Sequence, residues 1–253
     1  MKSIARQTGA ALGGRASVLT RQKCDHVKLD RLLNRLISAA PGREQDRLLL
    51  KTYRLVFPHA FAEEAVLWPV MRRVLPDGHE LTLRVEMEHQ AINELVTRLE
   101  TLDRASPERR QVLERTVALL RLDVRDEEDL LLPRLQANLT PGQLRRLGIA
   151  WEIVRRIAPT RAHPIVARRP PGNVLSALPL SLLDRCRDAV DVLRLSVGGR
   201  AAAPLRALSS TLARASGAVE RLPGMRRGED PATRIARRSS VARDPATGGF
   251  NRA

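Results

Sequence analysis

The sequence predicts an all-α protein: an up-down four-helix bundle with additional C-terminal helices and a disordered basic tail. Apolar residues recur at helical spacing in successive runs between residues 19 and 157. No run alternates apolar and polar residues over a useful length, as a half-buried strand would. Proline, glycine and helix-capping residues separate the runs, so each run is expected to be one helix of the bundle or one that follows it.

The first helix is predicted over residues 19–39, where one apolar stripe contains Val27, Leu29, Leu32, Leu33, Leu36 and Ile37. Pro41-Gly42 ends it. The second helical run covers residues 44–75 and stops near Pro76. Pro58 lies inside this run and cannot donate to the helix, so we expect a kink there.

The third and fourth helices are predicted from their start signals. Asp77 and Glu80 have the spacing of a capping box, which predicts a helix from there to about Leu102. Ser106-Pro107-Glu108 opens the next helix, because proline at the first helical position gives up no hydrogen bond. That helix should run to about Asn138.

The chain changes character after a fifth helix, which Thr140-Pro141-Gly142-Gln143 opens and which runs through about Ile157. Prolines then interrupt the pattern. One more amphipathic helix is predicted from Pro179 to about Leu195, and its acidic residues suggest a partly solvated face. Residues 223–253 have too little apolar surface to offset the cost of ordering. The expected units are an arm (1–17), the bundle (18–140), a helical extension with a Pro-rich connection (141–195) and a basic, largely disordered tail (196–253).

The charge is strongly basic and uneven. The net charge is +16 over 253 residues, and residues 161–253 hold 17 arginines against seven acidic residues. Such a balance suggests an anionic partner, although arginine-rich coding in a GC-rich genome gives the same composition. The tail lacks interleaved aromatic residues, so binding to nucleic acid should be weak, non-specific and salt-dependent.

A cytoplasmic location is expected from three features. Cys24 and Cys186 give no disulfide framework, which fits a reducing compartment. The N-terminus lacks the apolar core of a signal peptide. The apolar runs all fall short of the roughly 18 residues that a membrane span needs.

Two segments repeat one device: His59-x-x-x-Glu63 and Asp123-x-x-x-Glu127, each followed by a second Glu. Residues four apart lie on one helix face, so each pair aims two ligand groups at one point. His26, on the first helix, and His89, on the third, face the core beside apolar residues. Four helices thus offer ligands for a two-metal site inside the bundle.

Glu64 and Glu128 each follow a proposed ligand by one position, which rotates them about 100° around the helix axis. They are expected to hold ligand imidazoles in place rather than to bind metal directly.

These residues, in this order, resemble the hemerythrin-like (HHE cation-binding) family over about residues 18–140. The residues that carry the resemblance are His26, His59-x-x-x-Glu63-Glu64 with Pro69, Glu88-His89, and Glu127-Glu128 with Pro133. Residues 151–164 resemble an extension found in many bacterial members. The resemblance implies a bundle holding two non-haem irons (Fe), bridged by oxygen and by glutamate. Dioxygen, peroxide or nitric oxide would bind at an open position.

Carried over by position, His26, His59, His89 and Glu127 would be terminal ligands. Glu63 would bridge the irons, alone or with Glu127. Iron is favoured over zinc because a mixed imidazole and carboxylate set suits it.

Two departures bear on the chemistry. Asp123 stands where the family motif has a histidine, and Val85 stands where oxygen-carrying members have another, with Glu86 as a partial substitute. A larger carboxylate share stabilises ferric iron, so we expect poor reversible oxygen binding.

The sequence thus predicts a protein that binds, senses or stores iron and oxygen or a related small oxidant, rather than a catalyst. A di-iron peroxidase or oxidase is the alternative, but the Glu86-x-x-His89 spacing of ferritin-like enzymes occurs on one helix where two are needed. If Asp123 breaks the centre, the bundle would be a metal-free scaffold.

Overall fold

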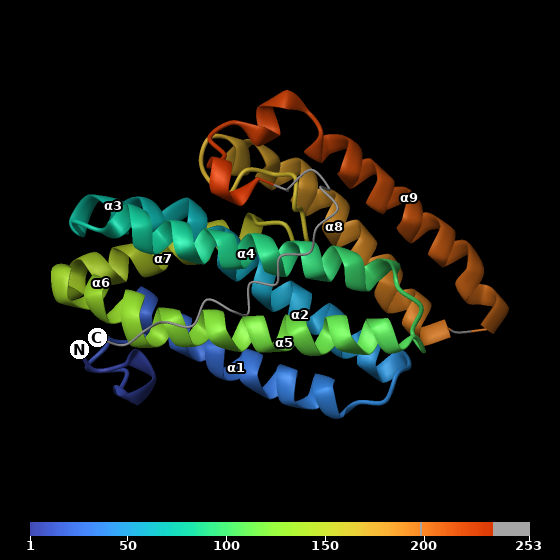
Figure 1. The fold of residues 1–253 in the computed structure, drawn as a ribbon, viewed down its shortest axis with the longest axis horizontal. Coiled ribbons are helices and arrows are strands. Elements are labelled where there is room, and N and C mark those ends of the chain that lie inside the picture. Colours follow the sequence, from blue (N-terminus) through green and yellow to red (C-terminus); the bar gives the residue numbers. More distant parts are fainter. Residues whose placement is uncertain (198, 235–253) are drawn as a thin grey trace.

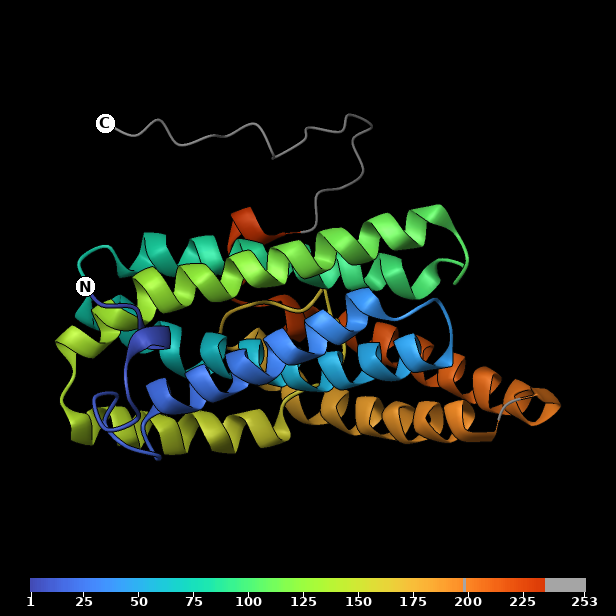
Figure 2. The same cartoon turned by 90° about the horizontal axis from the view of Figure 1, so that it is seen from below.

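The computed structural model describes residues 1–197 and 199–234, which form a helical bundle with a second helical layer along one side (Figure 1). The described residues contain helices and turns but no strand, so the predicted all-α class is confirmed. Four helical stretches form the bundle and run alternately up and down (Figure 2). They are α1 (Val18–Ser38), α2 (Arg43–Ala62) with α3 (Trp68–Val74), α4 (Gly78–Thr101), and α5 (Pro107–Asp126) with α6 (Leu132–Asn138).

The predicted start signals account for the first turns of two helices but not for that of a third. Ser106 Oγ accepts from the backbone N–H of Arg109 at the start of α5. A complete capping box between Thr140 and Gln143 begins α7 (Pro141–Ile157). The expected capping box at Asp77 is absent from the start of α4, because the Asp77 carboxylate accepts two hydrogen bonds from Arg134, at 2.6 and 2.7 Å.

Two π-helical turns interrupt the second and fourth stretches, at Glu63–Leu67 and at Glu127–Leu131. Each turn is followed, two residues on, by a proline, Pro69 or Pro133. In a regular α-helix the proline ring would collide with the carbonyl four residues earlier, and the wider turn avoids this. α2 continues through Pro58 to Ala62, where the first π turn follows.

The core consists of two apolar clusters, one toward each end of the bundle. One includes Leu19, Leu67, Trp68, Val85 and Leu131. The other includes Leu33, Phe57, Ile92, Val96 and Val117. On each of the four stretches a buried histidine or carboxylate lies between these clusters, so polar side chains interrupt the apolar core at one level. The predicted stripe of α1 is narrower than expected, because Val27 and Ile37 are exposed.

α7 lies against α1 and α2. Its Gly148 is buried at the crossing, where a Cβ would come within 2.0 Å of the Ala16 carbonyl oxygen and 2.7 Å of the Val18 nitrogen. The absence of a side chain therefore allows α7 to approach the start of α1 closely. Trp151, one turn further along α7, is completely buried over α2.

The second layer is a hairpin of α8 (Gly172–Val197) and α9 (Ala202–Glu220), and α8 contacts α2 (Figure 1). α8 begins seven residues before the predicted Pro179, and α9 occupies part of the tail that was expected to be largely disordered. α9 packs through small side chains, Ala202, Ser209 and Ser216, which hydrophobic periodicity does not detect. Residues 235–253 of that tail lie outside the described residues. Short 3₁₀ turns occur at Ile4–Arg6, Gly199–Ala201, Pro223–Arg226 and Pro231–Thr233.

Buried ion pairs attach this layer to the connection between α7 and α8. Arg161, in the connection before α8, pairs with Asp188 and Asp191 at 2.8 Å each. His163 lies between Asp184 of α8 and Glu220 of α9, at 3.0 Å from each carboxylate. The acidic face of α8 is therefore buried against basic partners, which corrects the expectation of a solvated face. In the described part of the chain, none of the helices has the length and apolar character to cross a membrane.

Gly148→Ala should destabilise the fold by about 1–3 kcal/mol or more, because the added methyl group meets backbone atoms that cannot move independently. Thermal unfolding measures the effect. Gly142→Ala in the same helix is the matched control, since the nearest atom to its Cβ is Thr140 Oγ1 at 3.9 Å. Equal melting temperatures for the two variants would contradict the proposed close packing.

The stabilising effect of His163 should disappear at alkaline pH. Burial opposes its charge, yet Asp184 and Glu220 raise the pKa of His163 to about 9. The unfolded chain has a histidine pKa of about 6.5, so this stabilisation is complete below that pH and is lost as pH rises through about 9. Denaturant unfolding from pH 6 to 10 should show that His163→Gln lowers stability at pH 6 and has progressively less effect near pH 10. His79→Gln, at an exposed position, should produce no such convergence.

Candidate metal centre

A polar layer crosses the bundle between the two apolar clusters. It consists of six side chains, each at most 11% exposed, that come from all four stretches: His26, His59, Glu63, His89, Asp123 and Glu127. α1 carries the first, α2 and its π turn the next two, α4 the fourth, and α5 and its π turn the last two. The six residues predicted as metal ligands are thus brought together.

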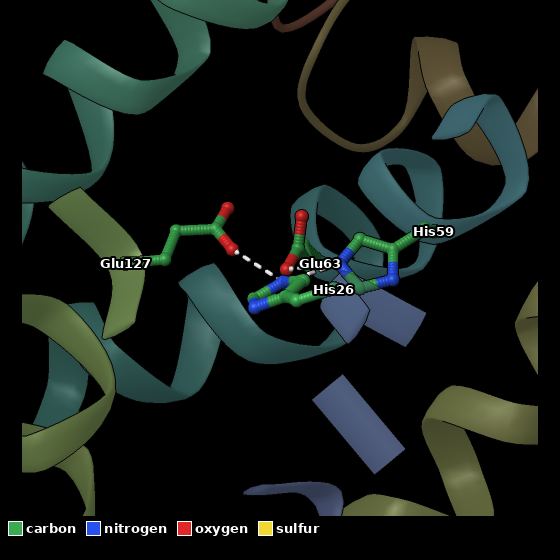
Figure 3. Close-up of side chains that lie close together, drawn as sticks. All are labelled: His26, His59, Glu63 and Glu127. Atoms are coloured by element: carbon green, nitrogen blue, oxygen red, sulfur yellow. Dashed lines mark hydrogen bonds and ion pairs between the residues drawn. The ribbon is translucent and has the colours of Figure 1, made fainter. Parts of the chain in front are cut away.

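Four of these side chains form one group (Figure 3). His26 Nε2 lies 3.1 Å from Glu127 Oε2, and His59 Nε2 lies 3.1 Å from Glu63 Oε1. The two imidazole Nε2 atoms are 3.3 Å apart. The ligand atoms of the four residues all lie within 4.8 Å of one another, which is close enough for one ion to contact all of them.

His89, Asp123 and Glu127 form a second group. His89 Nε2 lies 3.6 Å from Asp123 Oδ1 and 3.9 Å from Glu127 Oε1. Glu127 therefore belongs to both groups, one oxygen facing His26 and the other facing His89. Glu63 is placed in the same way, because its second oxygen lies 3.7 Å from His89 Nε2. The two adjoining groups thus share Glu127, and Glu63 of the first group also faces the second.

Several carboxylate oxygens of the polar layer lack hydrogen-bond donors, and a bound cation would supply the missing partner. Both oxygens of Glu63, Oδ1 of Asp123 and Oε1 of Glu127 are buried and accept no hydrogen bond of suitable geometry within the described residues, although Glu63 Oε1 lies 3.1 Å from His59 Nε2. Buried polar atoms nearly always have partners, so four such oxygens in one place need an explanation. Cations between the carboxylates and the imidazole nitrogens would satisfy them.

Each histidine also has a carboxylate behind it, and we call Asp25, Glu64 and Glu128 the outer carboxylates. His26 Nδ1 donates to Glu128 at 3.0 Å, and His89 Nδ1 donates to Glu64 at 2.9 Å. His59 Nδ1 lies 3.6 Å from Asp25. A carboxylate at Nδ1 fixes the imidazole with Nε2 turned inward, which is a common arrangement behind metal-binding histidines.

Two of the outer carboxylates were expected from the sequence and one was missed. Glu64 and Glu128 each directly follow a predicted ligand in the sequence. Asp25 directly precedes one, His26, so it too is a carboxylate next to a ligand in the sequence.

Glu86 was expected as a possible additional ligand, but it lies outside the polar layer. Its carboxylate pairs with Arg169 at 2.7 Å and with Arg72. Val85 lies in an apolar cluster.

The electrostatics of the layer favour extra protons or a cation. Burial opposes charge on His26, but Glu127 and Glu128 raise its pKa to about 9. Asp123 and Glu64 likewise outweigh burial and raise the pKa of His89 to about 10. Burial raises the pKa of Asp123 well above its usual value, and nearby carboxylates add to this. Metal binding would therefore release protons from these residues.

A small cavity adjoins the layer. Its volume is about 20 Å³, and its walls include Leu29, Phe57, Ile92, Leu120 and Val124 in addition to the histidines. A cavity of this size holds about one water-sized molecule. Its largely apolar wall suits a small, weakly polar molecule.

Comparisons with known proteins agree with this geometry. Residues 18–135 match the family described as the hemerythrin HHE cation binding domain. An uncharacterized hemerythrin-like protein of Schizosaccharomyces pombe is 22% identical over 134 residues, which cover 53% of this chain and 66% of that protein. The aligned part is thus slightly under two thirds of the relative's length. No solved structure matches the chain.

Proposed function

We propose that this chain, whose residues 18–135 form a hemerythrin-like cation-binding domain, holds two non-haem irons there and binds dioxygen or a related small oxidant. The observation that carries the proposal is the pair of adjoining ligand groups that share Glu127, with the second oxygen of Glu63 3.7 Å from His89 of the other group. A single ion would leave one group unused. Two ions would engage all six side chains of the polar layer.

The ligand chemistry supports iron. Three imidazoles and three carboxylates form a mixed nitrogen and oxygen set, whereas structural zinc sites commonly use thiolates. Cys24 and Cys186 are both exposed and are not part of the polar layer. Carboxylates that face two ion positions at once suit a pair of close metal ions, because each oxygen can bind a different ion.

The surrounding residues support a small ligand. When bound, the irons would supply the open coordination position and the redox chemistry. Asp25, Glu64 and Glu128 would keep the imidazoles oriented, and the apolar cavity wall would exclude larger or charged molecules. Because Asp123 replaces an imidazole by a carboxylate, ferric iron should be favoured, and reversible release of dioxygen should be poor.

A binding, sensing or storage role is better supported than ferritin-like oxidase chemistry. The latter would need Glu86 as a ligand beside His89, but Arg72 and Arg169 hold its carboxylate elsewhere. Peroxide as the small ligand is compatible with the same centre, as is nitric oxide.

The full chain should contain about two irons after anaerobic reconstitution. Elemental analysis gives the metal content, and an absorption spectrum of the same sample reports iron charge-transfer bands. Protein that retains no iron would contradict the proposal and favour a metal-free scaffold. A stable oxygen adduct that releases its ligand under vacuum would contradict the expected poor reversibility.

Substitutions in the polar layer should separate the shared ligands from the others. Glu63→Gln should lose both irons, because Glu63 faces both groups. Asp123→Ala should keep at least one, because the group of His26, His59, Glu63 and Glu127 remains intact. Asp123→His should bind iron more tightly, since it adds an imidazole at a position already in the layer. Iron content per chain, measured after desalting, distinguishes these outcomes.

Asp129→Asn is the matched control for this series. Asp129 lies in the same π turn as Glu127 but is exposed, so its loss should leave the iron content unchanged. Equal iron loss from Glu63→Gln and Asp123→Ala would show that Asp123 matters for both irons.

A further inference from the structure

We propose that Arg155 and Arg168, which lie outside the family match, are positioning residues that act through the outer carboxylates and raise the reduction potential of the metal centre. The proposal rests on the proposed function, since it concerns the irons held by the polar layer. It assigns a role to the region between α6 and α8: this region would complete the surroundings of the centre.

Arg155 reaches the centre from α7. Its Nη1 lies 3.6 Å from Asp25 Oδ2, and the same oxygen lies 3.6 Å from His59 Nδ1. The guanidinium is held by Glu152, at 2.9 Å, and lies over the Trp151 ring. That ring in turn meets the His59 ring edge to face, with centroids 5.3 Å apart. α7 thus places both an aromatic cover and a positive charge behind His59.

Arg168 reaches the centre from the connection between α7 and α8. Its Nη1 lies 3.7 Å from Glu64 Oε1, the oxygen that accepts from His89 Nδ1 at 2.9 Å. Its Nη2 donates to the carbonyl oxygens of His163, at 2.7 Å, and Val166, at 3.1 Å. The side chain is 9% exposed, so the guanidinium is fixed in place and shielded from water.

Two parallel series of imidazole, carboxylate and guanidinium therefore approach the polar layer, one behind each ligand group. His59, in the first group, is followed by Asp25 and Arg155. His89, in the second group, is followed by Glu64 and Arg168. The third outer carboxylate, Glu128, is 15% exposed and pairs with His26, without an arginine among its ion pairs in the described residues.

The electrostatic effect has a definite sign. A carboxylate at Nδ1 makes the imidazole a stronger electron donor, and a guanidinium on that carboxylate withdraws part of this charge. Each guanidinium also places a positive charge near the centre, which disfavours the more positive, oxidised state. The side chain of Arg168 is 9% exposed and that of Arg155 is 26% exposed, so salt should screen the charge of Arg168 less. Removing either arginine should therefore lower the reduction potential.

The neighbouring arginines provide matched controls for a purely structural role. Arg156, next to Arg155, is 76% exposed and pairs with Glu152. Arg169, next to Arg168, pairs with Glu86 and Asp230 and helps attach the C-terminal residues to α4. Neither forms an ion pair with an outer carboxylate in the described residues. If Arg155 and Arg168 acted only by holding the structure together, replacing Arg156 or Arg169 should change the reduction potential as much as replacing Arg155 or Arg168.

The test uses the full-length, iron-loaded chain. Arg155→Ala and Arg168→Ala should each lower the reduction potential in a spectroscopically monitored redox titration, and the double variant should lower it further. Arg155→Lys and Arg168→Lys should restore most of the shift, because they restore the charge. Arg156→Ala and Arg169→Ala should keep the wild-type potential. If the alanine variants do not fold, Arg155→Gln and Arg168→Gln give the same loss of charge with hydrogen-bond donors retained.

Iron content measured on the same samples separates the two proposals. A wild-type chain that loads no iron overturns the proposed function and this inference with it. Variants that load iron as the wild type does, yet keep its potential, overturn this inference alone. A shift that the lysine variants fail to reverse would assign the effect to altered packing rather than charge, and would also overturn it.

Discussion

The burial of three imidazoles and three carboxylates at one level of the bundle is the constraint on which the rest of the structure depends. Removing ionisable groups from water is costly unless they pair with one another or bind a metal. Within the described residues, His59 Nδ1 and four carboxylate oxygens of this layer are buried without a hydrogen-bond partner. The apolar clusters at both ends must therefore hold together a layer that is incomplete by itself. The π turns at Glu63 and Glu127 place these two glutamates in it.

The C-terminal layer accounts for part of the chain's basic composition. Residues 161–253 carry an excess of arginine over acidic residues, which from sequence alone suggested an anionic partner. Several of these arginines instead neutralise carboxylates of the chain itself: Arg161 pairs with Asp188 and Asp191, and Arg169 pairs with Glu86. Part of the positive charge is thus used internally, and a count of net charge overstates what remains for another molecule.

The parts that the sequence predicted correctly are those governed by local spacing. The i, i+4 pairs at His59 and Asp123 lie on one helix face whatever the rest of the chain does, and the bundle helices follow from apolar periodicity. Arg155 and Arg168 were missed because their roles arise from contacts between distant segments. Asp25 lies next to His26 in the sequence, but the imidazole it approaches is that of His59 on another helix. Glu86 was misjudged for the same reason: its spacing from His89 is suitable, but Arg72 and Arg169 compete for its carboxylate. α9 was not predicted, because the buried side chains on its packed face are mainly alanine and serine, which form no apolar stripe in the sequence.

The surroundings of the centre are asymmetric. Arginines lie behind two of its histidines, and a surface hollow lies beside the third. His59 and His89 are enclosed by α7 and by the connection that follows it, each with an arginine behind its carboxylate. His26 also lines a surface hollow between α1 and α5. That hollow and the small cavity share Leu29, Leu120 and Val124 as well as His26. Under the proposed function, this shared apolar wall would offer a small, weakly polar ligand a route to the centre beside His26, away from Arg155 and Arg168.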